Sequence, residues 1–465
     1  LLENGANTSF VNRIADQSIS IQELVADPVS SIERMATQEG GLGLPHPRIP
    51  LPRDLYGRER ANSAGIDMAN EHRLASLSSA LLATAHNGWK AGPMLGSSVS
   101  AGAEAPVLNP SDLRDVVGHV QEASLEDVDN ALLSALSAGP IWQATPPAER
   151  AAILERAADL MEADIQPLMG LLAREAGKTY ANAIAEVREA VDFLRYYADQ
   201  AELHPLAAPR GPFAAISPWN FPLAIFTGQI AAALVAGNPV LAKPAPQTPL
   251  IAFRAIQLMH AAGVPADALQ LLPGGGEVGT ALTSNPAIAG TVFTGSLPTA
   301  RRIDSAMAAH LAPTAPLIAE TGGLNAMIVD STALPEQAVQ SIIESAFQSA
   351  GQRCSALRCL YVQEDVADDV LKMLKGAMNL LRLGDPWQLS TDSGPVIDEP
   401  ARAGIAEHIA KARAEGRVLK DLSVPQGGTF VAPTLIEIPG IAALEREIFG
   451  PVLHVVRFKA RDLDR

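Results

Sequence analysis

From residue 210 onward, short apolar runs alternate with longer stretches of mixed polarity. Each apolar run has the length of one β-strand, and the apolar positions of the longer stretches recur with the spacing of a helix. Alternation of strand and helix is typical of a parallel sheet wound by helices, so the pattern predicts an α/β fold. The predicted strands cover residues 213–217, 239–243, 269–272, 291–294 and 316–320.

The segment before these strands is predicted to be helical. Between residues 125 and 200 the apolar positions follow three amphipathic patterns, including 148–161 and 181–197. Residues 225–240 are more apolar, but Gly228 and Gln229 interrupt them well short of the ~18 uninterrupted apolar residues of a membrane span. We therefore expect a buried helix there and no membrane span.

The first hundred residues have a different pattern. Residues 1–40 alternate short apolar and polar pieces, for which we expect helices or turns. A linker rich in glycine and proline follows at 40–52, and residues 70–89 have helical spacing. A second passage rich in glycine, alanine and serine covers 92–106. We therefore place the start of the main domain between residues 70 and 105.

The composition argues against several classes of partner and site. The chain has 35 Lys and Arg against 51 Asp and Glu, a formal net charge of −16, which disfavours binding to the phosphates of nucleic acids. Its two cysteines, Cys354 and Cys359, are too few for a disulfide framework and indicate a reducing, cytoplasmic compartment. The nine histidines are dispersed and the cysteines lack a metal-binding spacing, so no metal site is predicted.

Polar residues and glycines follow the predicted strands. Wound parallel sheets bind their ligands beyond the carboxyl ends of the strands, so the chemistry should lie there. The residues at these ends are Ser217, Pro218, Trp219, Asn220, Lys243, Gly274, Gly275, Gly276, Thr294, Gly295, Ser296, Glu320, Thr321, Gly322 and Gly323.

Cys354 is the candidate nucleophile. It lies between a helical run that begins at Pro335 and an apolar strand predicted over 357–362, and such a junction exposes a thiol. The thiolate form is strongly nucleophilic. The alternative is a small buried apolar residue, which is the usual state of a free cysteine. Cys359, inside the predicted strand, fits that alternative and is assigned a structural role.

Two more residues suit catalysis. Glu320 ends an apolar run, where a desolvated carboxylate could act as a general base; a helix cap or an ion pair is the alternative. Asn220 lies in a turn fixed by prolines, where its amide could donate to an oxyanion or else bind the backbone of the turn.

Lys243 and the glycines at 274–276 could bind a cofactor. Lys243 closes a strand and precedes Pro244, which suits a cation that contacts a cofactor hydroxyl or phosphate; a solvated lysine is the alternative. The glycines lack the Gly-Lys-Ser/Thr of a phosphate-binding loop and do not follow the first strand. We interpret them as a turn.

Six short motifs occur in a fixed order along the chain. They are PWNFP at 218–222, KP at 243–244, FTGS at 293–296, ETGG at 320–323, GQRC at 351–354 and EIFGP at 447–451. Together they resemble the NAD(P)-dependent aldehyde dehydrogenase superfamily over roughly residues 105–465. The resemblance implies an α/β fold with a Rossmann-like parallel sheet domain, an α/β catalytic domain and NAD as the cofactor.

The resemblance also implies a role for each motif. Cys354 would be the nucleophile, Glu320 the general base, and Asn220 would form the oxyanion hole with the Cys354 amide. Lys243 would bind the adenosine ribose, and Glu447 with Phe449 the nicotinamide ribose. The full set of implied coenzyme residues is Ser217, Pro218, Trp219, Lys243, Thr294, Gly295, Ser296, Thr321, Gly322, Glu447 and Phe449.

A finer resemblance concerns the substrate. EAGKT at 175–179 and AGQRCSALR at 350–358 are similar to the branch that oxidises glutamate γ-semialdehyde, formed from pyrroline-5-carboxylate, to glutamate. It implies that Ser355 and Arg353 bind the substrate, Ser355 at its α-carboxylate. Residues 1–13, 42–56 and 70–82 are similar to the region between the two enzymes of bacterial bifunctional proline-degrading proteins.

These resemblances predict three parts. Residues 1–104 would be the end of a proline dehydrogenase region with a linker, 105–320 the NAD-binding domain, and 321–465 a catalytic domain that is incomplete at its C-terminus. We expect a chain cut at both ends, whose parent also carries a proline dehydrogenase part and forms homo-oligomers.

Pro246 stands where many members of the superfamily have a glutamate for the adenosine ribose, which leaves the choice between NAD and NADP open. Two alternatives to a working glutamate semialdehyde dehydrogenase also stay open. One is a truncated module that binds NAD without turnover, and the other is an aldehyde dehydrogenase with a different aldehyde substrate.

Overall fold

The computed structural model describes residues 10–41, 44, 48–57, 60–85, 87–96, 102–203 and 207–462. The contacts within the chain divide it into two units, Leu1–Asn62 and Ser63–Arg465. Every residue predicted to take part in catalysis or binding lies in the second unit.

The first unit contains short helices. Its largest, α4, begins after Asp27, whose carboxylate accepts hydrogen bonds from Val29 N and Ser30 N, and ends at Gly40 in the left-handed conformation, with φ of 99°. The helices predicted within residues 1–40 are therefore confirmed for the described part; residues 1–9 lie outside it. The elements are α2 (Phe10–Ala15), α3 (Ile21–Leu24), α4 (Pro28–Glu39) and the 3-10 helix η1 (Pro52–Asp54).

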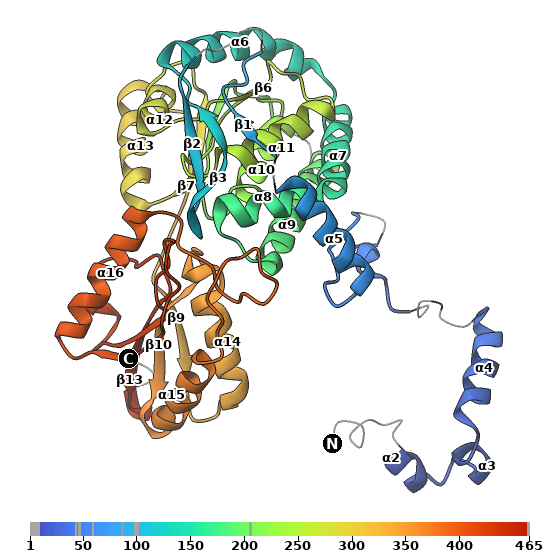
Figure 1. Ribbon diagram of the computed structural model, residues 1–465. Coiled ribbons are helices and arrows are strands. Elements are labelled where there is room, and N and C mark those ends of the chain that lie inside the picture. Colours follow the sequence, from blue (N-terminus) through green and yellow to red (C-terminus); the bar gives the residue numbers. More distant parts are fainter. Residues whose placement is uncertain are drawn as a thin grey trace. The chain divides into compact units, whose positions relative to one another are not determined.

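The second unit contains a parallel sheet of five strands in the order β6-β5-β4-β7-β8. Two of them, β6 and β7, are labelled in Figure 1. Each strand agrees with a predicted one to within one residue at either end, so the predicted parallel sheet is confirmed. Because the strands are parallel, their carboxyl ends meet at one edge of the sheet. The strands are β4 (Phe213–Ile216), β5 (Val240–Lys243), β6 (Leu269–Leu271), β7 (Gly290–Gly295) and β8 (Leu317–Thr321).

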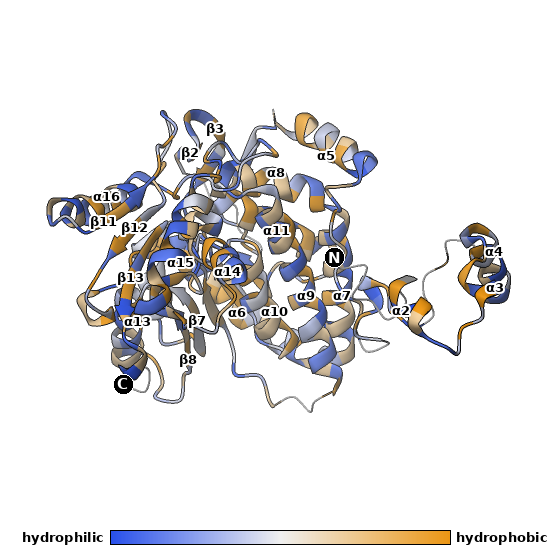
Figure 2. Cartoon of the chain, turned by 90° about the horizontal axis from the view of Figure 1, so that it is seen from below, coloured by the Kyte–Doolittle hydropathy of each residue, from blue (hydrophilic) through white to orange (hydrophobic). Residues whose placement is uncertain are grey.

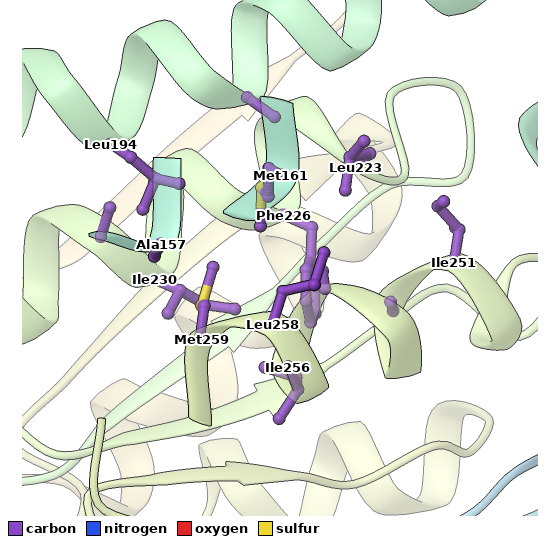
Figure 3. Packing of buried hydrophobic residues seen from close by; sticks show 14 of the residues in the cluster. Ala157, Met161, Leu194, Leu223, Phe226, Ile230, Ile251, Ile256, Leu258 and Met259 are labelled. Atoms are coloured by element: carbon purple, nitrogen blue, oxygen red, sulfur yellow. The ribbon is translucent and has the colours of Figure 1, made fainter. Parts of the chain in front are cut away.

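Helices pack on both faces of this sheet. Phe213 and Ala215 of β4 belong to a core cluster with α7, α9, α10 and α11, whereas Ala214 and Ile216 belong to a second cluster with α6, α12 and α13. Successive side chains of a strand point to opposite faces, which explains the alternation. Figure 3 shows the first cluster, in which Met161 and Phe226 lie among side chains from four helices. The helices are α6 (Leu125–Ala144), α7 (Pro147–Ala163), α9 (Tyr180–Leu203), α10 (Ala224–Val235), α11 (Pro249–Ala261), α12 (Gly276–Thr283) and α13 (Leu297–His310).

The helical region before the sheet differs from its prediction in one respect. Three helices were predicted between residues 125 and 200, but the region contains four, because α8 (Ile165–Ala176) is separate from α7. Only Asp164 lies between them, and it is both the C-cap of α7 and the N-cap of α8. Pro167, in the first turn of α8, is a sequence signal for this break that the prediction from apolar spacing did not use.

A small sheet of three strands, in the order β1-β3-β2, precedes these helices. The helical spacing predicted at 70–89 gives the helix α5 (Glu71–Thr84), but Trp89 lies in a strand instead of a helix. The passage predicted as a linker at 92–106 also contains the start of a strand, and Met94 exchanges two backbone hydrogen bonds with Leu271 of β6. The strands are β1 (Trp89–Ala91), β2 (Glu104–Asn109) and β3 (Asp112–Gln121).

A second sheet of five strands follows, in the order β11-β12-β13-β10-β9, with only the edge strand β11 antiparallel to its neighbour. The strand predicted at 357–362 is β10. At the other edge of this sheet lies β9, where Ile328 is 62% exposed. The elements are β9 (Asn325–Val329), α14 (Pro335–Phe347), η2 (Gln348–Gly351), β10 (Leu357–Gln363), α15 (Glu364–Met378), α16 (Glu399–Ala414), β11 (Val418–Asp421), β12 (Thr434–Glu437), η3 (Ile441–Ala443), β13 (Val452–Phe458) and η4 (Ala460–Asp462).

The helices differ in hydropathy according to how deeply they are buried. Figure 2 shows hydrophilic and hydrophobic residues along α7 and α9, as expected of helices with one face on the core. The stretch predicted as a buried helix at 225–240 overlaps α10, nearly all of whose residues are buried, but the helix ends at Val235 and Val240 already begins β5. Among the described helices, none combines the length and the apolar character needed to cross a membrane.

Candidate active site

The carboxyl edge of the first sheet joins residues from three strands by hydrogen bonds. Ser217, directly after β4, donates from its backbone N to the carbonyl of Lys243 at the end of β5 (3.1 Å). Its hydroxyl donates to Gln229 Oε1 (3.0 Å), and Gln229 Nε2 donates to Thr294 Oγ1 on β7 (2.9 Å). Thr294 is in register with Glu320 of β8. The predicted coenzyme residues of these strands thus lie along one connected edge.

Two further residues of this edge have local structural roles. Ser296 caps α13, because its hydroxyl accepts a hydrogen bond from Thr299 N (3.4 Å). Gly295 cannot carry a side chain without movement of its surroundings, because a Cβ there would lie 2.6 Å from the Phe293 ring. The backbone at the end of β7 therefore packs tightly against the Phe293 ring.

Lys243 is buried, with 5% of its surface exposed. Its Nζ donates to the carbonyl of Pro244 (3.1 Å). Desolvation lowers the pKa of Lys243 to about 8, and the nearby carboxylate of Glu122 partly opposes that shift. The solvated lysine considered as an alternative is thus wrong.

The glycines at 274–276 do not form an isolated turn. Gly276 is the first residue of α12 and Gly275 is its N-cap, so these glycines lead from β6 into a helix and the interpretation as a turn is wrong. A Cβ on Gly279, one turn further along α12, would lie 3.5 Å from Lys243 Cε. The amino-terminal part of α12 therefore lies beside the lysine.

The loop that carries Asn220 connects β4 to α10 and is fixed at its far end. Glu186 of α9 is fully buried and accepts hydrogen bonds from Leu223 N (2.9 Å) and Ala224 N (3.4 Å). Its other carboxylate oxygen forms an ion pair with Lys178, which is buried as well. A buried carboxylate with a charged partner and two amide donors is well compensated, so it holds the start of α10 in place.

Asn220 itself contacts the segment before the candidate nucleophile. Its Nδ2 donates to the backbone carbonyl of Gln352 (3.1 Å), two residues before Cys354. Next to it, the Phe221 ring lies 4.3 Å from Lys178 Nζ and 5.3 Å from the guanidinium carbon of Arg353. An amide has two N–H donors, and among the described residues Asn220 uses one of them, so the other is left for another acceptor.

The segment before Cys354 has an unusual backbone. Ser349, Ala350 and Gly351 all have left-handed φ, of 53°, 53° and 66°. For residues with a side chain this conformation costs of order 1 kcal/mol each, so it persists only where the surroundings impose it. Gln352 supplies part of that constraint, because its amide donates to Ser349 O (3.2 Å) and its Oε1 accepts from the backbone of Ile397 (2.8 Å). We call residues 349–354 the nucleophile loop.

Cys354 ends this loop with its side chain exposed. Asn325, at the start of β9, donates from Nδ2 to the carbonyl of Cys354 (2.6 Å) and to that of Ala356 (3.0 Å). The position fits the prediction of an accessible thiol after a helix and before a strand. Cys359 is fully buried in β10, and burial raises its pKa to about 11, which agrees with the structural role assigned to it.

Glu320 differs from its prediction. It was expected at the end of a buried strand, but β8 is the edge strand of its sheet and residues 318–320 are exposed. Within the described ranges, no side-chain hydrogen bond or ion pair holds the carboxylate of Glu320. The sequence shows only that the strand is apolar, and the order of strands in the sheet puts that strand at an edge.

The motif at 447–451 faces the end of β8. Glu447 fills the place that a Cβ on Gly322 would take, so its carboxylate lies against that backbone next to Thr321. The Phe449 ring contacts Trp219 edge to face, with centroids 5.5 Å apart. Burial raises the pKa of Glu447, and Arg358, which donates to its Oε1, opposes that shift.

The two residues predicted to bind substrate lie on either side of Cys354. Ser355 is exposed, and Arg353 is half-buried with its guanidinium above the Phe221 ring. Arg353 also donates to Gln348 Oε1. The two neighbours of the candidate nucleophile in the sequence thus carry a hydroxyl and a cationic side chain.

Sequence reasoning missed several residues that hold this site together. Arg358 and Lys178 stand inside quoted motifs, yet only their burial and partners reveal what they contact. Arg358 interrupts the apolar strand β10, and that anomaly is a signal that could have found it. Glu186 and Asn325 give no comparable signal, because polar residues of helices and strand ends are common.

Comparison with known proteins gives a family. The sequence profile described as "Aldehyde dehydrogenase family" matches residues 98–463, which is most of the chain. Among curated proteins, "1-pyrroline-5-carboxylate dehydrogenase" of Geobacillus kaustophilus is 38% identical over 380 residues, covering 77% of this chain and 73% of that protein. The chain is also similar to "Bifunctional protein PutA" of Klebsiella aerogenes, with 59% identity over 483 residues.

The coverage differs between these relatives. The match to the Klebsiella protein covers the whole of this chain but only 37% of the relative, so the chain spans about a third of its length. Among solved structures, a 1-pyrroline-5-carboxylate dehydrogenase from Thermus with bound NAD is 32% identical with a TM-score of 0.80. That match covers 86% of this chain and 82% of the Thermus chain.

Proposed function

The chain belongs to the aldehyde dehydrogenase family, and we propose that it oxidises L-glutamate γ-semialdehyde, formed from pyrroline-5-carboxylate, to L-glutamate. This would be a step of proline catabolism, and a nicotinamide coenzyme would accept the hydride. Two relatives named for pyrroline-5-carboxylate support the substrate, and neither alternative considered above gains support from the comparisons.

One observation carries the proposal. The amide of Asn220 donates to the Gln352 carbonyl, which links the loop after β4 to the nucleophile loop and supports Asn220 as the oxyanion donor. Nucleophile and oxyanion donor come from different sheets, and this contact unites them. Glu320, the proposed general base, is the next-to-last residue of β8, and Gly322, just after that strand, lies against Glu447.

The residues at the carboxyl edge fit a nicotinamide coenzyme. Lys243 is a buried cation whose described hydrogen bond uses one of its three N–H groups, which leaves donors for ribose hydroxyls. Glu447 has one oxygen bound by Arg358 and the other against Gly322, where it can accept from a second ribose. We propose NAD, which the Thermus relative binds, as the coenzyme, and Ser217, Pro218, Trp219, Thr294, Gly295, Ser296, Thr321 and Phe449 as further coenzyme residues.

In the proposed mechanism the Cys354 thiolate attacks the aldehyde carbon and forms a tetrahedral alkoxide. The free N–H of Asn220 and the Cys354 amide donate to the alkoxide oxygen, an effect typically worth about 10²–10³ in rate. A bound nicotinamide supplies the hydride acceptor for the C–H bond of this adduct. The thioester left on Cys354 is then hydrolysed by a water that Glu320 deprotonates, which releases the acid and restores the thiolate.

Ser355 and Arg353 are proposed to select the substrate. A hydroxyl and a guanidinium beside the nucleophile suit a substrate that carries a carboxylate as well as an aldehyde. Arg353 keeps donors beyond the one directed to Gln348. This distinguishes glutamate semialdehyde from aliphatic aldehydes of similar length.

The organisation of the chain is proposed from the same resemblance. Residues 105–320 would bind the coenzyme and 321–465 carry the nucleophile, while 1–104 would connect to a proline dehydrogenase part of a longer protein that forms homo-oligomers. A cytoplasmic location also stays a prediction. The similarity to a bifunctional protein along the whole chain supports this arrangement.

The proposal is tested by following NADH formation with glutamate semialdehyde and NAD⁺. The wild-type chain is expected to form NADH, and Cys354→Ala is expected to form none while binding NAD⁺ with an affinity within about twofold of wild type. Cys359→Ala is the matched control, because it removes the buried thiol of β10 and should leave turnover in place. NADH formation by Cys354→Ala would contradict the proposal.

A further inference from the structure

Arg358 of β10 is a buried arginine to which neither the motifs nor the mechanism give a role. Only 1% of its surface is exposed. Burial lowers the pKa of Arg358, while Glu447 and the Cys354 thiolate favour its charged form. Carrying a charge so deep in the protein is costly unless the surroundings compensate it fully, so its contacts need an explanation.

The guanidinium makes one hydrogen bond with each of its N–H groups. Its Nη1 donates to Gly351 O (2.7 Å) and to Gly450 O (3.2 Å), and its Nη2 donates to Arg353 O (3.0 Å). The remaining N–H of Nη2 and that of Nε donate to Glu447 Oε1, at 2.9 and 3.1 Å. A guanidinium has five such groups, so Arg358 is saturated.

These acceptors belong to two segments that are far apart in the sequence. Gly351 and Arg353 belong to the nucleophile loop, and Gly450 and Glu447 to the segment after η3. The two segments also touch directly, because Gly450 O occupies the place of a Cβ on Gly351. Arg358 thus lies between the backbone that presents Cys354 and the carboxylate proposed to bind the nicotinamide ribose.

The planar shape of the guanidinium makes this arrangement directional. Arg358 binds one oxygen of Glu447 through two N–H groups, which leaves Oε2 directed at Gly322 as a free acceptor among the described residues. Its carbon also lies 5.2 Å from the centre of the Phe449 ring, which contacts Trp219 edge to face. A lysine could supply at most three N–H groups and no planar fork.

We propose that Arg358 is a positioning residue that couples the two halves of the site: it fixes the nucleophile loop through backbone carbonyls and orients Glu447 so that its free oxygen meets the coenzyme. This inference rests on the proposed function for the identity of the coenzyme. The hold on the nucleophile loop rests on the hydrogen bonds alone.

The test uses Arg358→Lys, Glu447→Gln and the double variant, with Arg195→Lys as control. Arg195 is another arginine with 1% of its surface exposed, ion-paired to Asp159 and Glu162 outside the site. It therefore reports the general effect of replacing a buried arginine. Two properties are measured: NAD⁺ affinity, and hydrogen exchange of residues 349–356 and 447–452 in protein without coenzyme.

The affinity measurement tests the coupling. In Glu447→Gln, Arg358 donates to the amide oxygen. The amide NH₂ then stands where Oε2 would accept from the coenzyme, so NAD⁺ should bind about tenfold more weakly. Arg358→Lys should lower the NAD⁺ affinity by a similar factor, because the carboxylate of Glu447 is no longer oriented. The double variant should bind NAD⁺ no more weakly than whichever single variant binds it less tightly, since both substitutions break the same interaction between Arg358 and Glu447.

Hydrogen exchange tests the hold on the loop. Exchange at Gln352 and Ala356, whose amides donate to Ser349 and Arg353, should be about tenfold faster in Arg358→Lys. Glu447→Gln and Arg195→Lys should leave these amides at the wild-type rate. A wild-type NAD⁺ affinity in Arg358→Lys, losses that multiply in the double variant, or unchanged exchange would each overturn the proposal.

Two outcomes separate this inference from the proposed function. A wild-type chain that does not bind NAD⁺ contradicts the proposed function, while hydrogen exchange still tests the role of Arg358 in the loop. If Arg358→Lys does not fold, Glu447→Asp replaces it. Arg358 is fixed by three carbonyls and cannot follow the shorter side chain, so Glu447→Asp should lose as much affinity as Glu447→Gln; wild-type affinity would overturn the inference.

Discussion

Two segments of the site carry predicted catalytic groups and are held in very different ways. Asn220 lies on a loop whose ends are fixed by buried Glu186 and by Ser217, and its side chain bonds to the nucleophile loop. Glu320 lies on the edge strand β8, exposed and without a described side-chain partner. One group is fixed before any substrate arrives, and the other is free to rotate.

The difference agrees with the two steps of the proposed reaction. An oxyanion donor is effective only if its direction is set in advance, because reorganisation during the reaction would cost part of its benefit. A base that deprotonates a water after the coenzyme has accepted the hydride can move into place later. The comparison therefore predicts that changes around the Asn220 loop affect stability, whereas changes at Glu320 affect only a late chemical step.

Lys178→Met should have the largest effect on stability. It removes the charge that compensates Glu186, which is fully buried, so the free energy of unfolding should fall by about 3–5 kcal/mol. Urea denaturation at neutral pH measures this. Lys90→Met is the matched control, because Lys90 pairs with Glu104 at the surface, and its loss should cost less than about 1 kcal/mol. Equal losses in both variants would show that the Asn220 loop does not depend on the buried pair.

Asn220→Ala should come next, and its effect should be mainly kinetic. Loss of the oxyanion donor should lower kcat by about 10²–10³. The free energy of unfolding should fall by only about 1 kcal/mol, since one hydrogen bond to Gln352 O is lost. Steady-state NADH formation and urea denaturation on the same preparation separate the two. A loss of stability as large as that of Lys178→Met would mean that Asn220 holds the loop instead of serving the chemistry.

Lys243, which is buried, should affect both the pH dependence of stability and the binding of NAD⁺. Desolvation lowers its pKa to about 8 from 10.5, so below pH 8 the folded protein carries a buried charge that the unfolded chain solvates. Between pH 8 and 10.5 the unfolded state binds more protons, and stability should rise with pH by on the order of 3 kcal/mol or less. Lys243→Met should lack this rise and should bind NAD⁺ more weakly. Parallel pH profiles of the free energy of unfolding for both proteins would contradict the shift.

The fold could be predicted from the sequence because each strand of the first sheet is a separate apolar run between turn signals. The break between α7 and α8 was missed, although Pro167 in the first turn of α8 is a signal for it. The exposure of β8 could not be predicted, because the apolar residues 316–319 suit a central strand as well as an edge strand. The order of strands depends on packing between distant segments, which no local pattern encodes.

For the site, the sequence indicated Cys354, Glu320, Asn220 and Lys243 as candidates, and the structure puts each at the meeting of strand ends and loops. It did not indicate the residues that hold them. Arg358 acts through backbone carbonyls, which have no sequence signature, and Glu186 acts on the amides at the start of a helix.

The most direct test is the state of Cys354 in Glu320→Gln after one addition of glutamate semialdehyde and NAD⁺. If the free carboxylate acts only in hydrolysis, the variant should give one equivalent of NADH in a burst and then stop, with an acyl group on Cys354 detected by intact mass and peptide mapping. Its free energy of unfolding should stay within about 0.5 kcal/mol of wild type, since Glu320 is exposed. No burst, or an acyl group at any other residue, would contradict the account.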